Sequence, residues 1–241
     1  KFIPDGQDCG EGCLLASYIN ITDQPAGSVI QSEEDIRYVR IKLEHSWAGD
    51  LWIALQCPNG SYASILRKYN NGASSECSIH IPVAEWGWSG WVSSSGHDFG
   101  IKGYSDNTSN KCDSATNPIG TPWNYVWSYN TRHGYVYNPG NYVYYNDNIV
   151  SVYGQTVMDS TNVADMTNVF HPDGSFSSLV GCPLNGTWSL MIVDGWALDN
   201  GWLDEWELAF DGAGLALPAA PVISTSPCPQ AASATDPDGN V

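Results

Sequence analysis

The sequence predicts an all-β fold, a sandwich of antiparallel strands, and three observations point to it. Polar and apolar residues alternate with a period of two over several stretches, while no apolar stripe with the helical period of about 3.6 residues occurs. The 241 residues include 24 Gly and 14 Pro but only 15% charged residues, a composition typical of turn-rich β proteins. The 11 Trp and 13 Tyr suit pleated surfaces and a thick core. One large β-domain accommodates this length.

The first third of the chain contains a predicted meander of strands. Turn signals and short apolar pieces occupy residues 1–30. Residues 39–44 then alternate between apolar and charged, and after a turn at 48–50 the alternation resumes over 51–57. The Pro-Asn-Gly sequence at 58–60 ends that strand, and another strand follows directly.

The middle of the chain, about residues 72–165, has a different composition. Many Trp and Tyr residues are separated by Gly, Asn and Ser. We interpret it as a long, aromatic-rich loop insertion in the sandwich. Some short strands are expected inside it, because so long a loop without any secondary structure would be unusual.

Two further strands close the predicted sandwich. Asn185-Gly186 marks a tight turn, and residues 188–193 alternate after it. The sequence Asp199-Asn200-Gly201 marks the next turn. On the strand that follows, one face is expected to carry Trp202, Asp204, Trp206, Leu208 and Phe210.

The predicted domain covers residues 1–213. Beyond it the strand pattern stops and Ala, Pro and Ser dominate, so residues 214–226 are interpreted as a linker. Residues 227–241 are interpreted as the start of a following module. Because no charged-then-apolar leader precedes the domain, we expect a mature or excised segment.

The charge balance excludes some partners. The formal net charge is −17, and so negative a surface repels nucleic acid phosphates and anionic lipid. No apolar run approaches the roughly 20 residues of a membrane helix, so no membrane insertion is expected. Clustered carboxylates favour a hard cation such as calcium.

The seven cysteines are expected to form disulfides. None of them forms a Cys-x-x-Cys pair, and no histidine pair has zinc-ligand spacing. Disulfides imply an oxidising compartment, so the protein is expected to be secreted or at the cell surface. Cys228 is the odd one, and its partner is expected beyond residue 241.

Several short motifs occur in a fixed order along the chain. They are Ile3-Pro4-Asp5-Gly6, HSWAGDL at 45–51, CPNG at 57–60, NGTW at 185–188 and DNGWLDEWELAF at 199–210. In this order they resemble the P domain of proprotein convertases, also called the P/Homo B domain, and the resemblance covers about residues 1–67 and 170–211. The longer middle is more similar to P-like modules of large secreted and surface proteins of gliding bacteria, which implies export by type IX secretion. The resemblance implies a jelly-roll (galactose-binding-like) β-sandwich and a non-catalytic role.

The resemblance also implies disulfide pairs. That subgroup is expected to have cysteines near Val39 and Val126, and both positions are valine here. If those two cysteines normally pair with each other, their absence leaves a bridge between Cys57 and Cys182. The remaining implied pairs are Cys9 with Cys13 and Cys77 with Cys112.

Two sets of residues are candidates for binding. Aspartates near turns at one end of the sandwich are a predicted structural calcium site, although each could equally be a solvated turn residue. Its predicted ligands are Asp5, Asp50, Asp194, Asp199 and Asp204. Aromatic residues beside Asn and Asp suit a glycan or protein partner, although packing over the sandwich to hold the insertion in place is the favoured alternative. These residues are Trp86, Trp88, Trp91, Trp123 and Trp127.

The sequence offers few residues for catalysis. His45 beside Asp50 suggests a triad, but no strand-turn-helix nucleophile elbow accompanies it, so His45 is interpreted as structural. Glu205 and Glu207 lie two apart on a strand and could form a glycosidase pair, but a solvated strand face explains them as well.

Three hypotheses for function follow. The first is a non-catalytic accessory or adhesion module of a larger secreted or cell-surface protein, which supports other domains of the same polypeptide and recognises a protein or glycan. The second is the C-terminal stabilising domain of a subtilisin-like serine protease. The third is a jelly-roll enzyme acting on polysaccharide. No catalytic residue is assigned.

Overall fold

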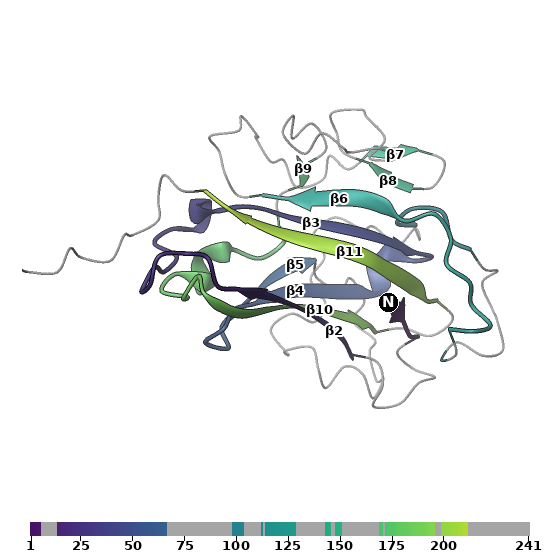
Figure 1. Cartoon of the computed structure of the whole chain (residues 1–241). Helices are drawn as coiled ribbons and strands as arrows, with labels where there is room; N and C mark the ends of the chain where they lie inside the picture. Colours follow the sequence, from purple (N-terminus) through teal and green to yellow (C-terminus); the bar gives the residue numbers. More distant parts are fainter. Residues whose placement is uncertain are drawn as a thin grey trace, which may run out of the picture.

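The computed structural model confirms an all-β sandwich (Figure 1). It describes residues 1–5, 14–66, 98–103, 112, 114–128, 143–145, 148–150, 169–170, 172–195 and 199–211. The only helical elements within this part of the chain are three short 3-10 turns: η2 (Glu33–Asp35), η3 (Ala48–Asp50) and η9 (Phe176–Leu179). In the described ranges no helix has the length and apolar character needed to cross a membrane.

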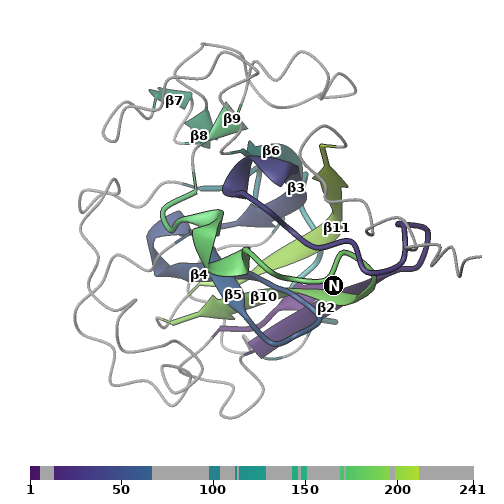
Figure 2. The same ribbon diagram turned by 90° about the vertical axis from the view of Figure 1, so that its left-hand side faces the viewer.

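Two sheets face each other across the core, and Figure 2 shows them as separate layers. The first sheet contains, in spatial order, β1 (Phe2–Ile3), β11 (Gly201–Phe210), β3 (Ile36–His45), β6 (Trp123–Trp127) and β9 (Val169–Phe170). The second contains β2 (Leu14–Ile21), β10 (Gly186–Asp194), β4 (Leu51–Gln56) and β5 (Tyr62–Leu66). A separate pair is formed by β7 (Val143–Tyr145) and β8 (Asn148–Val150). The chain passes repeatedly from one large sheet to the other, as in the predicted jelly roll.

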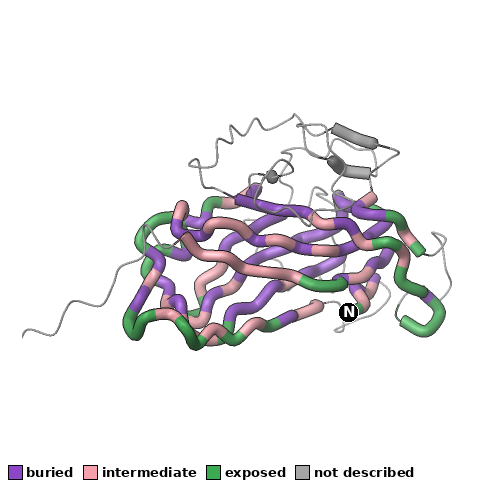
Figure 3. Tube along the Cα trace, turned by 45° about the horizontal axis from the view of Figure 1, so that its top comes forward, coloured by how far each residue is buried: buried purple, intermediate pink, exposed green. Residues whose placement is uncertain are grey.

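The core lies between the inner faces of the two large sheets. On β3, Val39, Ile41 and Leu43 point inward and are fully buried, as their alternation predicts. The matching inward residues of β10 are Trp188, Leu190 and Ile192. Figure 3 shows buried positions running along the strands, while exposed positions gather at the turns that end them.

Strand β11 differs from the prediction in its phase. Leu203 pairs with Leu43, but Glu205 pairs with Lys42, so Asp204 is the extra residue of a β-bulge. Ahead of the bulge Leu203 points inward, and beyond it Trp206, Leu208 and Phe210 pack against the core. Trp202 and Asp204 therefore do not share the face of those three residues, and that expectation was wrong.

The outer face of the second sheet is buried in part as well. Trp52, Ala54 and Val193 point away from the sandwich core, yet they form a second buried apolar cluster. The Nε1 of Trp52 donates a hydrogen bond to the Ser64 hydroxyl at 3.1 Å. The ring of Tyr62 packs edge-on against Trp52. This part of the outer face is therefore packed, where alternation alone would suggest a solvated surface, while Tyr18 on β2 is exposed.

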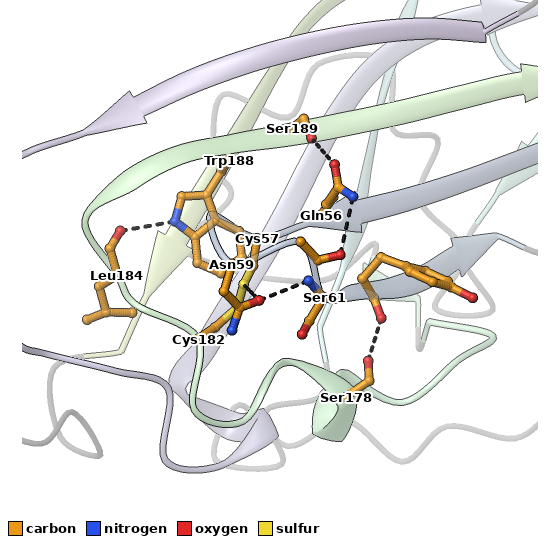
Figure 4. Close-up of a disulfide and its surroundings, with 11 residues drawn as sticks. Gln56, Cys57, Asn59, Ser61, Ser178, Cys182, Leu184, Trp188 and Ser189 are labelled. Atoms are coloured by element: carbon orange, nitrogen blue, oxygen red, sulfur yellow. Dashed lines mark hydrogen bonds between the residues drawn. A yellow bond between two sulfur atoms is a disulfide. The ribbon is translucent and has the colours of Figure 1, made fainter. Parts of the chain in front are cut away.

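The Cys57–Cys182 disulfide confirms the pair implied by the resemblance (Figure 4). It links the turn after β4 to the segment before β10, and both sulfurs belong to buried residues. Cys112 is also disulfide-bonded. Its predicted partner Cys77, and the predicted pair Cys9 with Cys13, lie outside the described residues.

Strand β6 comes from the stretch that we interpreted as a loop insertion. It pairs antiparallel with β3 over five residues and belongs to the sandwich itself. The stretch 72–165 therefore provides one strand of the sandwich as well as the pair β7 and β8.

Candidate functional site

A buried group of ionisable side chains lies at one end of the sandwich. His45 ends β3, Asp50 ends η3 just before β4, and Asp194 ends β10. Asp199 lies in the turn before β11, and Asp5 follows β1, which pairs with the start of β11. The strands run antiparallel and end together, so residues from three distant stretches of the chain come to the same end of the sandwich. All five side chains are buried.

His45 is held in one orientation by two contacts. Its Nδ1 accepts a hydrogen bond from the backbone N–H of Trp47 at 3.1 Å. Its Nε2 lies 3.3 Å from the Oδ2 of Asp194. Because Nδ1 is the acceptor, the ring proton belongs on Nε2, which then donates to the Asp194 carboxylate. Both side chains are fully inaccessible to solvent.

Burial sets the charge of the histidine. It lowers the pKa of His45 to about 4, although the carboxylates of Asp199, Asp98 and Asp5 act to raise it. His45 is therefore neutral at pH 7 and does not balance the charge of the surrounding aspartates. A second hydrogen bond, from the Ser46 hydroxyl to Oδ1 of Asp199 at 2.8 Å, holds another member of the group.

The predicted calcium ligands do not all lie in the buried group. Asp204 lies in the β-bulge, is exposed, and forms an ion pair with Lys42 at 2.7 Å, so it is not part of that group, and its role as a ligand stays a prediction. The other four aspartates reach the same end of the sandwich. Within the described ranges, however, no three His, Cys, Asp or Glu side chains converge as a metal ion requires. Calcium binding remains a prediction from the sequence.

Two of the predicted partner-binding tryptophans lie in the core. Trp123 and Trp127 are each only 2% exposed, and on β6 they lie opposite Leu43 and Val39. Those partners point inward, so the two indoles fill the sandwich and cannot stack on a glycan. This corrects the expectation for both residues. Trp86, Trp88 and Trp91 lie outside the described residues.

The paired glutamates of β11 hold an arginine. Arg40 on β3 contacts Glu205 at 2.8 Å and Glu207 at 2.9 Å, and the Tyr38 hydroxyl donates to Glu207 at 2.6 Å. Burial acts to raise the pKa of Glu207, but the hydrogen bonds from Tyr38 and Arg40 outweigh it and leave this pKa below its usual value. A glycosidase acid needs a raised pKa, so Glu207 is unsuited to that role.

Sequence analysis missed one buried acid. Glu44 is fully buried on the outer side of β3, where its Oε1 accepts from the N–H of Gly120 at 3.4 Å and its Oε2 has no hydrogen-bond partner among the described residues. Burial raises its pKa to about 8, and Asp98 acts in the same direction. Gly100, at φ 62°, brings its backbone close to the Glu44 side chain. No local signal could reveal this, because a Glu on the polar side of a strand normally faces water.

Comparison of the chain with protein-family models, with curated proteins and with solved structures finds no match, so the resemblance to P domains rests on its sequence motifs alone.

Proposed function

We propose that this chain is a non-catalytic β-sandwich module of a larger secreted or cell-surface protein, where it supports neighbouring domains and recognises a protein or glycan. The observation that carries the proposal is the state of its reactive side chains. His45 is buried and hydrogen-bonded on both ring nitrogens, and Glu205 and Glu207 hold Arg40. The residues that sequence analysis considered for catalysis are thus engaged in structural contacts.

Two further features support this role. The Cys57–Cys182 disulfide suits an oxidising compartment, which supports secretion. The P-domain motifs lie at structural positions: the HSWAGDL piece forms the end of β3 and the turn η3, while the NGTW piece begins β10. Their residues build the sandwich, as expected of a module that contributes stability and surface.

The experiment compares the chain joined to its natural flanking sequences with the separated pieces. We expect the flanking domains to melt at a lower temperature, or to be cleaved faster by added protease, when this module is removed. Equal melting and cleavage would contradict the supporting role. Hydrolysis of a polysaccharide by the isolated chain, abolished by Glu205→Gln or Glu207→Gln, would contradict the non-catalytic assignment.

A further inference from the structure

A groove lies at the end of the sandwich opposite His45, between the edge strand β5 and the turn η9. Its volume is about 720 Å³, within the range of ligand sites. Residues 59–64 line one side, and residues 174, 175, 177 and 178 line the other. The Cys57–Cys182 disulfide joins the chain just before the first wall to the chain just after the second (Figure 4).

Hydrogen bonds fix the two walls against each other. The N–H of Gly174 donates to the carbonyl of Ser64 at 3.0 Å, and the Ser178 hydroxyl donates to the carbonyl of Tyr62 at 2.6 Å. A side chain on Gly174 would approach the Ser64 carbonyl to 2.8 Å, so glycine allows this close contact. The groove is therefore preformed, which lowers the entropic cost of binding.

The lining of the groove is polar but uncharged. Five of its ten residues are serines, and Asn59 and Tyr62 add an amide and a phenol. None of the ten is charged, although the whole chain has a net charge of −17. Glu33 stands at the edge, where the Ser175 hydroxyl donates to its carboxylate at 2.6 Å.

Two hydrogen-bonding groups remain for a ligand. Oδ1 of Asn59 accepts from the backbone N–H of Ser61 at 2.9 Å, which fixes the amide and leaves its Nδ2 as a donor. Among the described residues neither that Nδ2 nor the Ser61 hydroxyl has a hydrogen-bond partner. Figure 4 shows these two residues together beside the disulfide.

The lining discriminates between classes of ligand. Anions find no cationic side chain here, and metal ions find no carboxylate among the lining residues. An added β-strand is disfavoured, because the carbonyls of Tyr62, Ser64 and Ile65 on β5 already accept hydrogen bonds from residues 173–178. Hydroxyls, an amide and one aromatic side chain match the hydroxyls and C–H faces of a sugar.

We propose that this groove binds a neutral saccharide. Asn59 and Ser61 hydrogen-bond its hydroxyls, and Tyr62 contacts its apolar face. The inference rests on the recognition part of the proposed function, for which it names the ligand class. Calorimetry on the isolated chain tests it separately from the supporting role, which the melting and cleavage of the flanking domains test.

The test uses isothermal titration calorimetry with short neutral oligosaccharides of gluco, galacto, manno and xylo configuration, and with uronic acid oligosaccharides as the charged comparison. We expect at least one neutral class to bind and the uronic acids to bind at least tenfold more weakly. Asn59→Asp keeps the oxygen that accepts from Ser61 but replaces the donor with a charged oxygen. It should weaken neutral binding about tenfold or more, which corresponds to about 1.4 kcal/mol.

Two controls keep the result interpretable. Thr187→Ala, at an exposed position on β10, should leave binding unchanged. An unchanged melting temperature of Asn59→Asp shows that this variant is folded, and Ser61→Ala provides a second, smaller change. The proposal is overturned if no neutral oligosaccharide binds, or if binding survives both groove variants and is lost in Trp88→Ala. That last result would instead favour the aromatic residues of the 72–165 stretch.

Discussion

The two ends of the sandwich are held in different ways. At one end of β4 and β10, His45 and Asp194 meet through a buried hydrogen bond among aspartates. At the other end of the same two strands, Cys57 and Cys182 form a covalent bond beside an uncharged groove. The first end depends on protonation, and the second depends on redox conditions. The sandwich is thus held at its two ends by interactions that respond to different solution conditions.

Removing the disulfide should have the largest effect. The double variant Cys57→Ala/Cys182→Ala opens a loop with a sequence separation of 125 residues. A crosslink over such a loop restricts the unfolded chain, so the free energy of unfolding should fall by about 4 to 5 kcal/mol. Urea unfolding at pH 7 measures this. A decrease in the free energy of unfolding of less than about 1 kcal/mol would contradict the view that the disulfide is the main stabilising interaction at its end of the sandwich.

Truncating the acidic end should have the next largest effect. Asp194→Ala removes the acceptor of His45 and leaves a buried ring N–H unsatisfied, at a cost of about 2 to 3 kcal/mol. Asp204→Ala is the matched control. It breaks an exposed ion pair with Lys42 and should cost less than about 1 kcal/mol. Equal losses in the two variants would contradict the structural distinction between these aspartates.

The pH dependence of stability should be a smaller effect, confined to the His45 end. The raised pKa of Glu44, about 8 against the ordinary 4.5, means that the native state keeps a proton that the unfolded chain has released. Stability therefore falls as pH rises between those values. The lowered pKa of His45, about 4 against 6.5, means that the unfolded chain binds a proton that the native state does not, so stability falls as pH drops from 6.5 to 4.

The effects of Glu44 and His45 on the free energy of unfolding oppose each other between about pH 4.5 and 6.5. The net loss of stability should therefore occur from about pH 6.5 to 8. We expect about 1 to 2 kcal/mol over that window. Urea unfolding at a series of pH values measures it, and Glu44→Gln should remove most of it. A profile that Glu44→Gln leaves unchanged would show that another group titrates. The disulfide variant should keep the wild-type profile.

Removing metal should have the smallest effect. The described carboxylates do not by themselves converge on one point, so they should contribute little to ion binding, and melting temperatures in EDTA and in calcium chloride should agree within about 1 °C. Differential scanning fluorimetry with the two buffers measures this. A clearly higher melting temperature in calcium would support calcium binding and would require ligands in addition to Asp5, Asp50, Asp194 and Asp199.

The local sequence pattern predicted where the strands lie, but it did not predict at every position which side chains face the core. Alternation and turn residues located β3, β4, β10 and β11, because both signals are local. At Asp204 a β-bulge adds one residue to β11 and changes which face the following side chains occupy. The sequence does not reveal the bulge, because apolar and polar residues occur on both sides of it.

The candidate site was predicted less completely than the strands. Turn aspartates indicated Asp5, Asp50, Asp194 and Asp199, which do meet at one end. The hydrogen bonds of Asp194 to His45 and of Asp199 to Ser46 depend on distances across strands that no spacing in the chain specifies.

By itself the sequence determined an acidic chain of alternating strands, the turns between them, and the cysteines available for crosslinking. Only the tertiary structure decided which faces are buried. Alternation separates two faces of a strand without saying what covers either of them. Trp123 and Trp127 became core residues because β6 pairs with β3. Glu44 is buried through contacts with residues more than fifty positions away, and contacts of that range depend on packing, which no local pattern records.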